Sequence, residues 1–359
     1  MRIGVLTGGG DCPGLNAVIM SIVKVGIRSF NDQIIGIQDG FEGLVKNKMT
    51  KLDLDKIRGI LSRGGTILGS SNKYDPFRCQ EKIDGVTTFI DRSDKAVENY
   101  KTNGIECLIV VGGDGSLVIA DKFAKKGLNV IGIPKTIDND LSVTDITFGF
   151  DTTINTVMEA IDRIQTTAKS HHRIMVVEVM GRDAGWIALY AGIAGGAHVI
   201  LIPEIDFNFN TIVDKIYERK GDDKHFTVLV VAEGAKEGGS DQIVKRHVDE
   251  APDSRRLGGI GDYVARELEA RTSIESRCTA LGHIQRGGSP SAFDRVLSCR
   301  YGAAGVKFAH AGKFDHMVAL QTPNIVAVPI KEALKQIKTI TPTSDLINTA
   351  KQIGINFGV

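Results

Sequence analysis

The segment Pro134-Lys135-Thr136-Ile137-Asp138-Asn139-Asp140 carries two carboxylates two residues apart, with a hydroxyl just before them. A carboxylate can take the proton of an alcohol, and a neighbouring hydroxyl suits that chemistry. Phosphoryl transfer needs an oriented nucleophile and charge neutralisation more than covalent chemistry. We therefore predict that Asp138 is a general base, with Thr136 and Asp140 beside it. The alternative is a turn rich in Asp and Asn, which is common between elements.

Two glycine-rich segments could hold phosphate groups. They are Gly8-Gly9-Gly10-Asp11 and Gly112-Gly113-Asp114-Gly115-Ser116, and each follows a short apolar run. Glycines let backbone N–H groups approach a phosphate at the start of a helix. In the second segment, Asp114 could hold Mg²⁺ and Ser116 could donate to a phosphate oxygen. The alternatives are a tight turn for the first segment and a capped helix start for the second.

Four arginines lie next to predicted strand ends, namely Arg173, Arg182, Arg277 and Arg286. An arginine fork matches phosphate oxygens in a bidentate manner. A surface salt bridge is the alternative for any one of them, but the glycines beside Arg182 and Arg286 favour contact with a ligand. Glu233 follows an apolar strand and could accept hydrogen bonds from sugar hydroxyls; its alternative is an acid at a helix N-terminus.

Continuous apolar runs precede these polar segments and predict buried parallel strands. The runs cover 2–6, 105–111, 130–133, 174–179, 226–232 and 278–281, and helical patterns follow at 15–29, 117–126 and 186–194. Such alternation predicts an α/β fold whose mostly parallel sheets are covered on both faces. Ligands bind beyond the carboxyl ends of such strands, where the polar segments lie. We expect two Rossmann-like domains with the active site in the cleft between them.

Length and composition fit this class. The chain has 359 residues, 42% of them hydrophobic and 24% charged, which is enough for two medium domains. A net charge of +1 favours neither nucleic acid nor an anionic membrane as a partner. The five cysteines are scattered, and none forms a C-x-x-C pair, so we expect free thiols of a reducing cytoplasm. No apolar stretch is long enough to span a bilayer.

With these motifs in this order, the chain resembles the 6-phosphofructokinase family. The resemblance runs from Arg2 to about Gly312. The segments that carry it are Gly9-Gly10-Asp11, Gly112-Gly113-Asp114-Gly115-Ser116, Thr136-Ile137-Asp138-Asn139-Asp140, Ser170-His171-His172-Arg173-Ile174, Met180-Gly181-Arg182 and His283-Ile284-Gln285-Arg286.

The resemblance implies a role for each matching residue. Asp138 would take the proton of the 1-hydroxyl of fructose 6-phosphate, and Asp114 would position Mg²⁺. The catalytic residues would be Thr136, Asp138, Asp140 and Arg182. The residues that bind the phosphoryl donor would be Gly9, Gly10, Asn72, Lys73, Gly113, Asp114, Gly115, Ser116 and Lys135. The residues that bind the substrate would be Thr136, Asp138, Arg173, Met180, Gly181, Arg182, Glu233, Arg277, His283 and Arg286.

The resemblance also implies domains and an assembly. Residues 1–149 plus about 288–340 would form the phosphoryl-donor (ATP) domain, and residues 150–287 plus the C-terminal segment the fructose 6-phosphate domain. Arg173 and Arg277 match arginines that reach the substrate from a neighbouring subunit. The family resemblance therefore implies a homotetramer, or a dimer, in which subunits complete one another's sites.

Two positions bear on the phosphoryl donor. Pyrophosphate users of the family typically carry Asp at the position of Gly115 and Lys at that of Lys135, so the two positions disagree here. A carboxylate at Gly115 would fill the space of a nucleotide α-phosphate and oppose its charge, whereas Lys135 can serve either donor. We therefore expect ATP, with pyrophosphate as the alternative. The donor-contacting arginine of the bacterial pattern is replaced by Lys73, which keeps a positive charge without the fork.

Two other classes of protein are alternatives. NAD and diacylglycerol kinases also use a Gly-Gly-Asp-Gly segment, but they lack the segments around Asp138 and His283. A non-catalytic regulatory subunit would be expected to lose Asp138, Arg182 or Asp114, and this chain keeps all of them.

Overall fold

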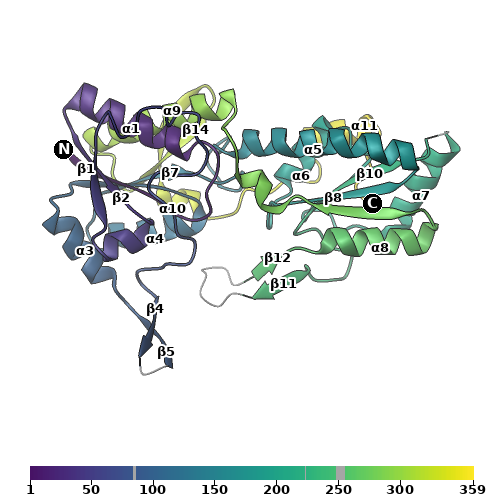
Figure 1. Cartoon of the computed structure of the whole chain (residues 1–359), viewed down its shortest axis with the longest axis horizontal. Coiled ribbons are helices and arrows are strands. Elements are labelled where there is room, and N and C mark those ends of the chain that lie inside the picture. The colour runs from purple at the N-terminus through teal and green to yellow at the C-terminus, as the bar shows by residue number, and fades with distance from the viewer. Residues whose placement is uncertain (84–85, 223, 248–254) are drawn as a thin grey trace.

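A computed structural model describes residues 1–83, 86–222, 224–247 and 255–359. Within them, the chain forms two lobes that lie side by side along the long axis of the molecule, each built on its own sheet (Figure 1). The larger lobe holds a seven-stranded sheet and the smaller lobe a four-stranded one.

The seven-stranded sheet has a parallel centre and antiparallel edges. Its order is β15 (Asn324–Pro329), β14 (His316–Gln321), β7 (Val130–Pro134), β6 (Cys107–Gly112), β1 (Arg2–Thr7), β2 (Gln33–Ile37) and β3 (Met49–Leu52). The edge strands β15 and β3 are antiparallel to their neighbours, and the strands between them run parallel. This geometry brings the carboxyl ends of β1, β6 and β7 to one edge of the sheet.

Alternate residues of these strands are buried under two different layers of helices. Ile109 and Val111 of β6 pack in one core with α1 (Leu15–Phe30) and α9 (Ala292–His310). Leu108 and Val110 pack in a second core with α2 (Phe41–Val45), α3 (Ser93–Thr102) and α4 (Asp114–Lys125). Burial on both faces explains why the run 105–111 is apolar throughout instead of alternating.

The smaller lobe repeats this arrangement. Its order is β13 (Ser276–Ala280), β8 (Ile174–Val179), β10 (Thr227–Ala232) and β9 (Val199–Leu201), all parallel. Helices α5 (Phe150–His171) and α6 (Trp186–Ala194) share one core with β8 and β10, and α7 (Phe209–Gly221) and α8 (Ile260–Thr272) share the other. The predicted fold class, with two Rossmann-like and mostly parallel sheets, is confirmed.

Two elements differ from the sequence prediction. The helix expected to begin near Leu117 begins at Asp114, so the glycine-rich segment ends inside its first turn. In the tail, β15 is followed by two short helices, α10 (Ile330–Ala333) and α11 (Asp345–Gln352), and β14, which precedes them, was not predicted. Its buried run is only Met317 to Leu320. It forms a hairpin with β15, and only its other partner, β7, is distant in sequence.

Two hairpins project on the same side of the molecule (Figure 1). One is β4 (Cys79–Ile83) with β5 (Val86–Ile90), and the other is β11 (Val244–His247) with β12 (Arg255–Leu257). The second lies in the stretch 236–261, which is rich in glycine and charged residues and of which residues 248–254 lie outside the described residues.

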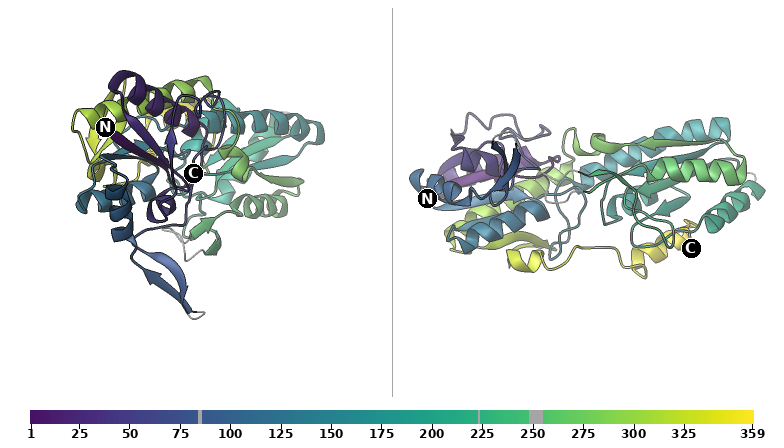
Figure 2. Two further views of the ribbon diagram at one scale, coloured as in Figure 1. Left: turned by 60° about the vertical axis from the view of Figure 1, so that its left-hand side comes forward. Right: turned by 90° about the horizontal axis from the view of Figure 1, so that it is seen from below.

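The chain crosses between the lobes at 135–149, at 287–291 and at 334–344. The last crossing is the yellow segment that runs from one lobe to the other in the right-hand view of Figure 2. Beyond it, Asn356 pairs with the edge strand β9, where Ile200 N donates to Asn356 O at 2.9 Å. The C-terminal segment is thereby attached to the smaller lobe.

Candidate active site

A cleft of about 1120 Å³ lies at the carboxyl ends of β1, β6 and β7 on one side and of β8, β10 and β13 on the other. It confirms the predicted location between the two lobes. The predicted site residues that line it are Gly9, Gly10, Asn72, Gly113, Asp114, Gly115, Ser116, Lys135, Thr136, Asp138, Met180, Arg182, Glu233, His283 and Arg286.

The two glycine-rich segments form one wall. Gly9 adopts the left-handed conformation, with φ of 79°, and a side chain on Gly8 would come within 2.6 Å of Ser116 Oγ. Glycine at these positions therefore permits a close approach that larger residues would block. Because α4 begins at Asp114, the unpaired N–H groups of its first turn open onto the cleft.

Thr136 and Asp138 lie at the base of the cleft. Thr136 Oγ1 is 3.3 Å from Asp138 Oδ2, and Asp138 N donates back to Thr136 Oγ1 at 3.1 Å. Both residues are at least nine-tenths buried. Asp138 Oδ1 is buried without a hydrogen-bond partner, which leaves one carboxylate oxygen free to accept a proton.

Asp140 stands behind the cleft and is not among the residues that line it in the described part of the chain. Its Oδ1 is also buried without a hydrogen-bond partner. Burial, followed by the nearby charges of Asp138 and Asp114, raises the pKa of Asp140 to about 7. The three carboxylates are therefore close enough to repel one another.

Lys135 supplies a buried cation beneath the first glycine segment. Its Nζ donates to the carbonyl oxygen of Gly10. Burial lowers the pKa of Lys135, and the neighbouring charge of Arg286 lowers it further. Asp138 and Asp114 act in the opposite direction, because their negative charges favour the ammonium form.

Arg182 and Glu233 form the opposite wall. Arg182 follows Gly181 (φ 140°) and has itself a left-handed φ of 51°; its backbone N donates to Glu233 Oε1 at 3.2 Å. Arg182 Nη1 reaches across the cleft to 3.8 Å from Asp114 Oδ2. Burial raises the pKa of Glu233 to about 7, with the charge of Asp138 contributing less.

Arg286 also bridges the two lobes. It ends the short 3₁₀ helix η1 (Gly282–Arg286), and its Nη1 donates to Asp11 O at 3.3 Å. A side chain on Gly10 would come within 2.9 Å of the same guanidinium. Arg286, predicted to bind the sugar phosphate, therefore also lies against the first glycine-rich segment.

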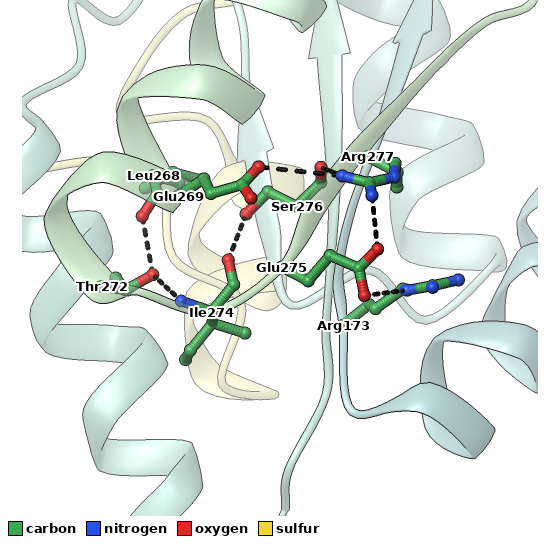
Figure 3. Close-up of polar contacts among 8 residues, drawn as sticks. All are labelled: Arg173, Leu268, Glu269, Thr272, Ile274, Glu275, Ser276 and Arg277. Atoms are coloured by element: carbon green, nitrogen blue, oxygen red, sulfur yellow. Dashed lines mark hydrogen bonds and ion pairs between the residues drawn. The ribbon is translucent and has the colours of Figure 1, made fainter.

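Arg173 and Arg277 lie outside the cleft, at the amino ends of β8 and β13 (Figure 3). Glu275 accepts from both: Arg173 Nε lies 2.8 Å from its Oε2, and Arg277 Nη2 pairs with its Oε1. Glu269 is 3.8 Å from Arg277 Nη1. The structure therefore does not bring these two arginines together with the other predicted substrate-binding residues of the same chain.

Lys73 and Gly181 are also absent from the cleft lining among the described residues, although Asn72, Met180 and Arg182 beside them belong to it. Lys73 is exposed.

The sequence prediction missed one end of the cleft, which is lined by Phe41, Tyr74, Val118, Ile119 and Lys122. Three of these follow Gly115 on α4 at spacings of three, four and seven residues, which is one face of a helix. That periodicity could have identified them, had the helix been predicted to begin at Asp114. Glu178 and the hairpin residues Lys245 and Arg255 were missed as well.

Among the described residues, no group of three or more His, Cys, Asp or Glu side chains is arranged to hold a metal ion by itself. Mg²⁺ often uses only one or two carboxylates together with substrate phosphates. Asp114 lines the cleft beside the glycine-rich segments, so the chemistry of the residues present fits such an ion. No helix in the described part of the chain is both long and apolar enough to cross a membrane.

Two α/β lobes with glycine-rich loops on one wall, an acid and a hydroxyl at the base and an arginine opposite are typical of a phosphotransferase. The family model described as "Phosphofructokinase" matches residues 2–309. The chain belongs to the phosphofructokinase family, as its sequence motifs predicted.

Its relatives include users of both phosphoryl donors. The chain is 51% identical over 358 residues to "ATP-dependent 6-phosphofructokinase 2" of Clostridium perfringens, covering 99% of this chain and 98% of the relative. It is 46% identical over 362 residues to "Pyrophosphate--fructose 6-phosphate 1-phosphotransferase" of Streptomyces coelicolor, covering 100% of both.

Among solved structures, Pichia pastoris phosphofructokinase in the T-state matches with a TM-score of 0.80 and 29% identity. The match covers 98% of this chain and 36% of that one, so this chain spans about a third of the length of the yeast protein.

Proposed function

We propose that this protein transfers a phosphoryl group from MgATP to the 1-hydroxyl of fructose 6-phosphate, giving fructose 1,6-bisphosphate, as a step of glycolysis. The observation that carries the proposal is the buried, unpartnered Oδ1 of Asp138 at the base of the cleft. A general base needs a free oxygen within reach of the proton it removes. Thr136, which is paired with the other oxygen, holds the carboxylate in place.

The larger lobe is the proposed donor domain. Gly9, Gly10, Gly113 and the first turn of α4 offer backbone N–H groups to the donor phosphates. Ser116 and Lys135 add a hydroxyl and a cation on the same wall, and Asn72 also lines it. Lys73, next to Asn72 in the chain, would reach the donor only by moving its side chain. Bound Mg²⁺, which Asp114 would hold, neutralises phosphate charge.

The smaller lobe is the proposed acceptor domain. Glu233 and His283 would bind sugar hydroxyls, with the Met180–Gly181 backbone beside them, and Arg286 would bind the sugar phosphate. Arg182 faces Asp114 across the cleft, so its guanidinium is suited to stabilise the group in transfer. Asp140 would act through electrostatics, since it lies close to Asp138 without lining the cleft.

ATP is the proposed donor because the cleft has room for a nucleotide. A side chain on Gly115 would meet no atom within 4 Å, so the space beside it is open. Beyond Gly115 the cleft continues along Val118, Ile119, Phe41 and Tyr74. Apolar and aromatic surfaces of this kind suit a purine ring and would be of no use to pyrophosphate.

Pyrophosphate remains the second candidate because of Lys135, which carries a cation into the donor wall. The Streptomyces coelicolor relative, named for that donor, supports the same possibility. Purified protein assayed with fructose 6-phosphate and each donor tests the choice. Turnover with pyrophosphate alone would overturn the ATP proposal, and turnover with neither would favour a non-catalytic subunit.

Gly115→Asp is the matched variant for this assay. It should lower kcat/KM for ATP by about 10-fold or more, because a carboxylate would oppose the α-phosphate. Any activity with pyrophosphate should change less.

We further propose a cytoplasmic homo-oligomer, a tetramer or dimer, in which Arg173 and Arg277 reach the sugar phosphate of a neighbouring subunit. Their position at the amino end of the smaller sheet, away from the cleft of their own chain, supports this arrangement.

A further inference from the structure

The crossing at 334–344, here called the strap, contacts both lobes at the base of the cleft. It leaves the larger lobe after α10 and enters the smaller lobe at α11. On its way it runs beside residues 138–145, here called the Asp138 loop, which begins with the proposed base. Ile337 pairs with Leu141 in an antiparallel bridge, and Lys338 N donates to Asp140 O at 2.8 Å.

The Asp138 loop needs support from outside because part of its backbone is strained. Asn139 and Val143 have positive φ values of 51° and 63°. Asparagine adopts this conformation more readily than most residues, but it is a true outlier for a β-branched residue such as valine. Such conformations persist only where surrounding contacts determine them.

Lys338 supplies several of these contacts from one ammonium group. Its Nζ donates to Thr144 O at 3.1 Å and to Asp145 O, and lies 3.5 Å from Asn139 Oδ1. The same Asn139 oxygen accepts from Thr147 N at 3.1 Å. The ammonium therefore ties the two ends of the Asp138 loop together.

The smaller lobe fixes Lys338 from the other side. Trp186 Nε1, on α6, donates to Lys338 O at 2.8 Å, and the ammonium lies 5.3 Å from the centre of the indole ring. Ile340 N donates to Glu204 Oε1 at 2.9 Å, and Glu204 also accepts from Gly185 N at the start of α6. Lys338 is thus held between the Asp138 loop and the first turn of α6.

The charged groups that face this ammonium are Asp145 and Asp140 of the loop, and Glu204 lies further along the strap. Burial lowers the pKa of Lys338 to about 8, and the two aspartates partly oppose that shift. The ammonium is therefore charged at neutral pH and begins to lose its proton not far above it.

We propose that Lys338 is a positioning residue for the phosphoryl-transfer step: by tying Asn139 to Thr144 and Asp145, it holds the Asp138 loop in the conformation that aims the Asp138 carboxylate into the cleft. This inference rests on the proposed function of Asp138. Lys338 does not line the cleft among the described residues, so it acts through the loop and not on the substrate.

The test compares Lys338→Met and Lys338→Arg with Lys335→Met. Lys335 lies on the same strap but is exposed and pairs with Glu332 at 2.6 Å. Lys338→Met should lower kcat about 10- to 100-fold, since small displacements of reacting groups have effects of this size. KM for donor and sugar should stay within about threefold. Lys338→Arg should recover much of kcat, and Lys335→Met should match the parent.

The single tryptophan of the chain, Trp186, reports on folding because it binds the strap directly. Parent-like fluorescence and thermal unfolding in Lys338→Met would show that the loss of kcat is not a loss of fold. If that variant fails to fold, Lys338→Arg and the parent still test the proposal by their pH profiles. The parent kcat should decline above about pH 8 as Lys338 loses its proton, and the arginine variant should show that decline at higher pH.

A parent-like kcat in folded Lys338→Met, or identical alkaline limbs in the parent and Lys338→Arg, would overturn the inference. These results differ from failure of the proposed function, in which the parent protein itself would have no turnover with fructose 6-phosphate and either donor.

Discussion

The two ends of the smaller sheet carry the same residue types in opposite settings. At the carboxyl end, Glu233 and Arg182 line the cleft, and burial raises the pKa of Glu233 to about 7. At the amino end, Glu275 sits between Arg173 and Arg277 on the surface (Figure 3). There the hydrogen bond from Arg173 holds the pKa of Glu275 below its usual value.

The two ends differ in how strongly solvent reaches their charged groups. In the cleft, the free-energy cost of desolvation is the main effect on these polar groups. A partner such as a ligand would therefore stabilise each of them. At the amino end, solvent weakens the ion pairs, so a phosphate dianion could replace Glu275 at little cost. In the proposed oligomer, these two arginines would bind the sugar phosphate only together with a neighbouring subunit.

The largest expected effect is at the base of the cleft. Asp138→Asn keeps the shape of the side chain but removes the proton acceptor, so kcat should fall by about 10² to 10⁴. Steady-state kinetics with fructose 6-phosphate measures the loss, and thermal unfolding checks the fold. Turnover equal to that of the parent would exclude Asp138 as the base.

The next effect tests the amino end. Arg277→Ala and Arg173→Ala should each raise KM for fructose 6-phosphate about 10- to 100-fold, because each removes charge-assisted bonds to the phosphate. KM for the donor should change little. A parent-like KM for the sugar would show that this end takes no part in binding.

Mixed oligomers of two variants test whether the arginines at the amino end serve the cleft of a neighbouring subunit. Asp138→Asn subunits keep their arginines, and Arg277→Ala subunits keep their base. The two folded variants are mixed so that their subunits exchange and form mixed oligomers. If each arginine serves a neighbouring subunit, these mixed oligomers should recover part of the activity at low sugar concentration. Activity equal to the average of the separate variants would mean that Arg277 serves its own chain.

A smaller effect concerns stability without ligand. The pKa of Glu233 is raised from 4.5 to about 7 on folding, so the folded state binds more protons across this window. The free energy of unfolding should therefore fall as pH rises from about 4.5 to 7. Glu233→Gln removes this loss and should be more stable than the parent by up to about 2–3 kcal/mol at pH 8. Denaturant unfolding at pH 4 and pH 8 measures it.

The smallest effect, with the opposite sign, is expected for Glu275→Gln. The pKa of Glu275 is lowered on folding, so its contribution to stability is present above its usual pKa and is lost as pH falls through the folded value. The variant should be slightly less stable than the parent at neutral pH and equal to it in acid. A destabilisation as large as the Glu233→Gln gain would contradict the solvent-weakened pairing described above.

The sequence predicted those parts of the fold and site that depend on local patterns. Apolar runs located β1, β6, β7, β8 and β10, because strands buried on both faces need no alternation. The glycine segments and Asp138 follow strand ends, so their meeting in one cleft follows from parallel topology.

Other features depend on contacts that no local pattern records. Glu275 joins two arginines only because β13 and β8 pair with Ser276 opposite Ile174. Lys338 meets Asn139 from nearly 200 residues away in sequence. The start of α4 was placed too late because Gly115 weakens a helical pattern, although glycine is tolerated in a first turn that faces a ligand.

Gly115 has an evolutionary consequence. Because a side chain there would meet no protein atom within 4 Å, substitution at this position should leave stability nearly unchanged. If Gly115 selects the phosphoryl donor as proposed, a lineage could change its donor at this position without passing through a poorly folded ancestor, which is the usual barrier to new function. Such a change would alter the donor while leaving the fold of the ancestor intact.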